Sequence, residues 1–264
     1  MLKCPSRVSR PSPTQHDLQM DYAPTAADLL NVWELGRSQP PVDRALSLLQ
    51  VAMRESPREA LARFGIGCRD AELLKLREKI FGSGMTGHAN CPACGQQMEL
   101  NFTVAEVQAT PLAELAETYT EIFGEYEITF RLPNSTDVAT LVPGDDLAAQ
   151  KRRLVQRCVL KAKCSGQLVA ADQLREHAVT ALSERMSELD PQGDVQLALT
   201  CPLCRHRWDA PLDIASFVWS EIHAWAIRLL HNVHALALAY GWGEGDILTM
   251  SPWRRQAYLE LIGQ

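Results

Sequence analysis

The sequence predicts an α+β fold with a helical region at each end of the chain and a strand-containing middle. Three observations lead to this prediction. Apolar residues recur at helical spacing in the first third of the chain and again after Leu212. Alternating apolar and polar residues, typical of half-buried strands, occur at 98–104, 126–132 and 195–201. Two Cys-Pro-x-Cys tetrapeptides, at 91–94 and 201–204, lie beside the first and last of these stretches.

Length and composition bound the class of protein. The chain has 264 residues, of which 46% are hydrophobic, so it is able to bury a substantial core. A net charge of −6 argues against broad electrostatic affinity for nucleic acid. Residues 1–21 lack the apolar run of a signal peptide, and no apolar stretch is long and uncharged enough to cross a bilayer. We therefore expect a protein that is cytoplasmic in the producing cell and has no membrane contact, with its thiols reduced.

The N-terminal part divides into a polar arm and a helical region. Residues 1–24 are rich in Pro and polar residues, which predicts a flexible arm. Residues 25–84 predict a region of four helices. Thr25 is suited to cap the first helix, Pro40-Pro41 precedes the second, Ser56-Pro57 opens the third, and the fourth runs from Asp70 to Gly82.

The middle of the chain predicts an α/β segment, and the end predicts further helices. Residues 105–194 predict an α/β segment with helical patterns at 145–163 and 171–189 and a hairpin over 125–141, whose turn is "RLPNSTD". Residues 213–264 predict a helical tail. Its long helix follows Leu212 and stops at Gly241, and Ser251-Pro252 starts a last helix.

The two cysteine pairs predict one tetrahedral metal site. Structural zinc favours four thiolates, and each Cys-x-x-Cys turn offers two sulfurs from one tight knuckle. Gly95, after the first pair, suits the positive-φ position that closes such a turn. We therefore predict one structural Zn²⁺ per chain on four ligands, Cys91, Cys94, Cys201 and Cys204. The fold is then an interrupted zinc ribbon, 85–104 plus 195–212, with the α/β segment 105–194 inserted between its halves.

Other interpretations of the cysteine pairs stay open. A thiol oxidoreductase places its reactive cysteine at a helix N-terminus, whereas Cys94 leads into a strand-like stretch. Disulfides are disfavoured in a reducing compartment. His88 and His206 flank the pairs and offer alternative ligands, but four cysteines already complete the shell. A closed shell has no position for water, so the metal is expected to be structural rather than catalytic.

The sequence contains no catalytic constellation that we recognise. It has no phosphate loop ending in Lys-Ser/Thr, no G-x-S-x-G elbow and no H-E-x-x-H. His223, His231 and His234 share one arc of the long helix, where ordinary packing or interfacial histidines are expected. Cys68 and Cys158 are expected to be buried, inert thiols. We expect a non-enzymatic protein with no small-molecule substrate.

Longer stretches of the sequence carry a family resemblance. "LLNVWELGRSQPPVDRALSLLQVA" and "GIGCRDAELLKLREKIFG" precede the first cysteine pair, and "GWGEGDILTMSPWRRQAYLELIGQ" closes the chain. Together with the cysteine knuckles they resemble zinc-ribbon-containing phage baseplate or tail-assembly proteins, encoded with contractile phage tails and extracellular contractile injection systems. The resemblance implies a structural or assembly role, other baseplate or tail proteins as partners, and incorporation in a phage-tail-like particle. It implies no catalytic residues.

A second functional hypothesis is a nucleic-acid-binding zinc ribbon. "RHRW" follows Cys204 and joins two arginines to an aromatic ring, as in ribbons that stack on bases. The acidic total charge and the lack of basic residues beside the first pair argue against it. Nucleic acid is therefore not the expected partner.

Overall fold

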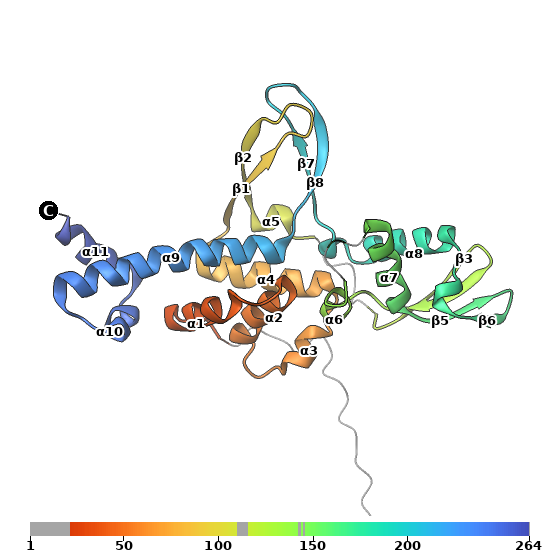
Figure 1. Cartoon of the computed structure of the whole chain (residues 1–264), viewed down its shortest axis with the longest axis horizontal. Coiled ribbons are helices and arrows are strands. Elements are labelled where there is room, and N and C mark those ends of the chain that lie inside the picture. Colours follow the sequence, from red (N-terminus) through yellow and green to blue (C-terminus); the bar gives the residue numbers. More distant parts are fainter. Residues whose placement is uncertain (1–21, 110–115, 142–143, 145, 264) are drawn as a thin grey trace, which may run out of the picture.

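The computed structural model describes residues 22–109, 116–141, 144 and 146–263. Most of the arm predicted at residues 1–24 therefore lies outside the described residues. The described chain has a helical body, from which two hairpins project on one side (Figure 1). The inserted α/β segment lies at one end of this body and the last two helices lie at the other (Figure 1). The mixed α+β fold, with helical N-terminal and C-terminal regions, confirms the predicted fold class.

Four helices form the N-terminal region, as the sequence predicted. They are α1 (Ala26–Gly36), α2 (Pro41–Ala52), α3 (Arg58–Ala62) and α4 (Ile66–Phe81). Thr25 caps α1: its hydroxyl accepts a hydrogen bond from the Asp28 amide, and the Asp28 carboxylate accepts one from the Thr25 amide. Pro41 begins α2, where its missing N–H costs no hydrogen bond.

The long helix α9 (Ile214–Tyr240) organises the body. Its 27 residues begin at the Asp213 cap and end at Gly241, whose φ is +70°. One face, from Ile214 to Leu236, is buried against α1, α2 and α4 in the main hydrophobic core. Helices α10 (Glu244–Thr249) and α11 (Pro252–Ile262) fold back onto the end of α9. The sequence did not predict α10, which is only 6 residues long.

Two antiparallel hairpins carry the cysteine pairs. The first joins β1 (Gly84–Asn90) to β2 (Gln97–Thr103), and the second joins β7 (Gln196–Thr200) to β8 (Arg207–Pro211). Strands β2 and β7 match predicted stretches. Strands β1 and β8 were not predicted: β1 reads "GMTGHAN", which has two glycines and little strand propensity. Pairing with its neighbour makes it a strand.

The inserted segment builds a second core. Its strands β3 (Tyr119–Phe123), β4 (Tyr126–Phe130), β5 (Val159–Cys164) and β6 (Gln167–Val169) form one antiparallel sheet in chain order. The helices are α5 (Val104–Val107), α6 (Ser135–Val138), α7 (Leu147–Cys158) and α8 (Glu176–Leu189), with short 3₁₀ helices at Ala171–Gln173 (η2) and Pro191–Gly193 (η3). The inward side chains of β4, with those of α7 and α8, fill this core.

Two details of the segment differ from the sequence prediction. The hairpin expected over 125–141 is wrong, because β4 turns back onto β3, and residues 135–138 form α6 after the Asn134 cap. The helix expected at 145–163 ends at Cys158, where the chain becomes β5 and pairs with β4. Helical periodicity within α7 gave no sign of this change, since strand pairing is not a local property.

Candidate metal centre

The first knuckle is a tight turn between β1 and β2. The Gly95 amide donates to the Cys91 carbonyl at 2.8 Å, and the Cys91 amide donates to the Gln96 carbonyl at 2.9 Å. Gly95 has a φ of +74°, the left-handed conformation predicted for it. This geometry turns the Cys91 and Cys94 sulfurs toward the same side of the hairpin.

The second knuckle repeats the first. The Arg205 amide donates to the Cys201 carbonyl at 3.0 Å, and the Cys201 amide donates to the His206 carbonyl at 2.9 Å. Arg205 occupies the position of the glycine in the first turn and has a φ of +63°. A non-glycine residue there is strained. The left-handed conformation of Arg205 was not predicted, although the identical Cys-Pro-x-Cys pattern of the two turns indicates it.

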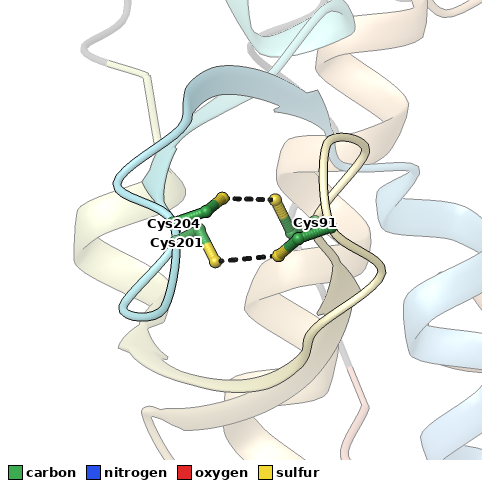
Figure 2. Close-up of side chains that lie close together, drawn as sticks. Cys91, Cys201 and Cys204 are labelled. Carbon is green, nitrogen blue, oxygen red and sulfur yellow. Dashed lines mark hydrogen bonds between the residues drawn. The ribbon is translucent and has the colours of Figure 1, made fainter.

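The four sulfurs converge. Cys91 Sγ lies 3.6 Å from Cys204 Sγ, and Cys94 Sγ lies 3.6 Å from Cys201 Sγ (Figure 2). All four lie within 4.8 Å of one another. A tetrahedral ZnS₄ site with bonds of about 2.3 Å requires sulfur separations of about 3.8 Å. A disulfide would need about 2.05 Å. The arrangement therefore fits one metal ion and does not describe disulfides.

Each short sulfur contact joins one knuckle to the other. A redox-active Cys-x-x-Cys instead needs its two sulfurs to face each other within one tetrapeptide, with the first at a helix N-terminus. Both tetrapeptides here lie between strands. The geometry thus favours a shared ion over two separate dithiols.

Burial and charge distinguish the cysteines of each pair. Cys91 and Cys201 are buried against Met98 and Trp208, whereas Cys94 and Cys204 are exposed. The amides of Cys204 and Leu203 donate toward the Cys201 sulfur and lower its pKa to about 7.

A second thiolate is harder to form without a cation. The Gln96 amide favours ionised Cys94, but the neighbouring sulfurs of Cys204, Cys201 and Cys91 disfavour it and raise the Cys94 pKa to about 12. Four sulfurs at this spacing ionise together only when a cation compensates their charge, which a metal ion does.

Hydrogen bonds at the base of each hairpin position the knuckles. The Val104 amide donates to the Ser83 carbonyl at 2.9 Å below the first hairpin. The Leu212 amide donates to the Val195 carbonyl at 2.9 Å below the second. Both hairpins therefore rise from closed bases on the helical body, and they meet at their tips.

The remaining candidate ligands stay outside the cluster. Among the described residues, the only group of three or more ligand side chains is the four cysteines. His88 is exposed on β1, and His206 stacks on Trp208 with ring centroids 5.8 Å apart. On α9, the His223 Nδ1 accepts a hydrogen bond from Trp33 Nε1 at 2.9 Å, and His231 contacts the carbonyl of its own helix four residues back. Nothing brings these histidines, or His234, to a shared ion in the described part of the chain.

The other cysteines are consistent with inert thiols. Burial raises the pKa of Cys158 to about 12 and that of Cys68 to about 11, so both are protonated at neutral pH. Cys158 belongs to the core of the inserted segment, and Cys68 is half-buried in α4.

The fold and the site define a protein with a split four-cysteine ribbon mounted on a helical body. The family described as T4 bacteriophage base plate protein matches residues 66–219, more than half of the chain. The chain belongs to this family, in agreement with the resemblance seen in the sequence. The match includes α4, both hairpins and the inserted segment. No curated protein and no solved structure matches the chain.

The family's description places its members in the phage baseplate. Among the described residues, no helix is long and apolar enough to span a membrane.

Proposed function

We propose that this protein is a non-enzymatic structural or assembly component of the baseplate of a contractile phage-tail-like injection system. Its partners are then other baseplate or tail proteins of the particle, and it is made in the cytoplasm of the producing cell. Family membership supports this assignment. The observation that carries it furthest is the convergence of four sulfurs from two distant segments, because such a site holds segments together and leaves no position for a substrate.

The metal in this proposal is Zn²⁺, one per chain, on Cys91, Cys94, Cys201 and Cys204. Thiolate ligands select zinc among the common divalent ions, and tetrahedral sulfur sites are typical of it. When bound, the ion contributes folding free energy and performs no chemistry. The chain's own residues supply the rest: amide–carbonyl hydrogen bonds close the two turns that carry the sulfurs, and Met98 and Trp208 pack against the buried pair.

The domain organisation follows from the same proposal. The ribbon, 85–104 plus 195–212, is the joint between the helical region 25–84, the inserted segment 105–194 and the tail 213–264. Zinc then fixes the two chain crossings between body and insert, because one hairpin precedes the insert and the other follows it. A rigid joint of this kind suits a scaffold that holds several partners in fixed geometry.

Deletion of the coding sequence in a strain that produces the particle tests the assignment. We expect electron microscopy to show tubes or sheaths without baseplates, with normal particles restored by the wild-type chain. If a variant with serine at all four cysteines also restored normal particles, assembly would not require the zinc site. Normal particles in the deletion strain would contradict the proposal.

A further inference from the structure

A cationic pocket lies on the helical body, away from the cysteines. It has a volume of about 390 Å³ and is lined by Arg37, Arg44, Trp219, Ser220 and His223. These residues come from the end of α1, from α2 and from α9. The lining contains two guanidinium groups and no carboxylate.

Arg44 is fixed in place at this pocket. Its Nε donates to the Gly36 carbonyl at 2.9 Å, its Nη2 donates to the Arg37 carbonyl at 3.3 Å, and its guanidinium lies over the Trp219 ring, 4.9 Å from the centroid. Trp219 itself is packed against α1, since a Cβ on Gly36 would come within 2.3 Å of its ring. The floor of the pocket and one cation are therefore preorganised.

His223 is oriented by a different contact. An indole N–H only donates, so the His223 Nδ1 that accepts from Trp33 is the unprotonated nitrogen. The proton of the neutral ring then lies on Nε2, which leaves that nitrogen a donor. The Ser220 hydroxyl lines the pocket but donates its proton to the Ser216 carbonyl at 2.9 Å, so it is not a free donor. Arg37, whose guanidinium lies 5.5 Å from the Trp33 centroid, adds the second cation. The pocket presents fixed donors and positive charge over an aromatic surface.

No acid in the described part of the chain compensates the charge of these two arginines. Within the described residues, neither Arg37 nor Arg44 has a carboxylate at ion-pair distance, whereas Arg58, Arg77 and Arg185 each have one. The whole chain carries a charge of −6, so this pocket is a local positive site on an acidic protein.

We propose that the pocket binds a carboxylate-bearing segment of a partner protein in the assembled particle. Planar carboxylates match the bidentate donors of arginine, and an aromatic floor accommodates the methylene groups of a Glu or Asp side chain. A single pocket of this size admits one or two side chains, whereas a nucleic acid needs a track of cations. That the partner is a protein rests on the proposed function. The pocket adds the chemistry by which that partner would be recognised.

The test uses the full-length protein and an oligoglutamate peptide, with binding followed by fluorescence anisotropy. The ¹⁵N–¹H resonances of the Trp33 and Trp219 indoles locate the binding. We expect both indole signals to shift and the affinity to fall as salt rises. Arg37→Glu is expected to weaken binding about tenfold or more, because it replaces a charge-assisted donor with a repelling charge. Arg37 is exposed, so this variant keeps the Arg44 contacts and the fold.

Arg228→Glu is the matched control, an exposed arginine of α9 outside the pocket. It should leave the affinity near that of the wild type. Equal weakening by both variants would reduce the effect to total charge and overturn the proposal. Binding of oligothymidylate but not of the peptide, or of neither, would also overturn it. Zinc content and melting temperature are measured on the same samples, so failure here leaves the baseplate assignment separately testable.

Discussion

Arg77 of α4 holds Glu221 of α9 through two hydrogen bonds of 2.8 Å, from Nε and Nη2 to the two carboxylate oxygens. The arginine side chain is only 2% exposed. It also donates to the carbonyls of Gly82 and Gly84, where the chain leaves α4 and enters β1. One side chain thus joins the helical body to the base of the first hairpin.

Arg77→Ala should lower the unfolding free energy by about 3–5 kcal/mol, the usual cost of breaking a buried pair and leaving its partners unsatisfied. Chemical denaturation of the zinc-loaded protein measures it. Arg185→Ala is the control, because its pair with Glu121 is 37% and 30% exposed and should matter far less. Equal effects of the two substitutions would contradict a special role for Arg77.

Loss of one ribbon thiol should release the metal. Cys204→Ser is expected to weaken zinc binding by more than about a hundredfold, the upper range for changes outside the ligand shell. The melting temperature should fall with it, because binding and folding are coupled. Cys164→Ser, in β5 and remote from the site, should keep both zinc and stability. A Cys204→Ser protein with full zinc would refute the four-thiolate shell.

The contact between Gly67 and Asp190 should tolerate no side chain. The Gly67 amide donates to Asp190 Oδ2 at 2.8 Å, and a Cβ on Gly67 would lie 1.7 Å from Oδ1. Gly67→Ala is therefore expected to cost about 1–3 kcal/mol of stability. Gly245→Ala, in α10 with open space around it, should instead gain up to about 1 kcal/mol. A neutral Gly67→Ala would mean that α4 and the loop after α8 separate easily.

Asp137 makes stability depend on acid pH. Burial alone would raise the pKa of this carboxyl, but hydrogen bonds from Arg131, Asn134 and Arg157 lower it below the ordinary value. Its contribution is complete above the unfolded pKa of about 3.9 and is lost as the pH falls through the lower folded pKa. The stability difference between wild type and Asp137→Asn should therefore be constant above about pH 5 and shrink below about pH 4.

Asp190 serves as a control, because its carboxyl should make stability depend on pH in the opposite direction to that of Asp137. Burial raises the pKa of its carboxyl, and the amides of Gly67 and Gly193 offset this only in part. Its unfavourable contribution grows as the pH rises from the unfolded pKa through the folded one. Asp190→Asn should thus gain stability relative to wild type as the pH rises from about 4. Parallel pH profiles for both variants would contradict these assignments.

Local signals in the sequence were sufficient for part of this structure. Caps and apolar periodicity predicted α1, α2 and α9, and two Cys-x-x-Cys turns predicted that Cys91, Cys94, Cys201 and Cys204 come together. The structure brings these four together across the inserted segment.

Features that depend on contacts between distant parts of the chain could not be predicted from local sequence signals. β1 and β8 are strands because of their neighbours, and the Arg77–Glu221 pair joins helices far apart in sequence. The cationic pocket has the same origin, since its two arginines meet Trp219 only after α1 and α2 pack on α9.

In the proposed site, one zinc ion is held by four thiolates from both ends of the insert. Its most direct test is metal content of the purified native protein, with thiol alkylation before and after chelation. We predict one zinc per chain and four thiols that react only after the chelator. Cys158 should stay slow because it is fully buried, and Cys68 should stay slow because it is half-buried in α4. A folded, metal-free chain whose four ribbon thiols react at once, or form a disulfide within each pair, would contradict the account.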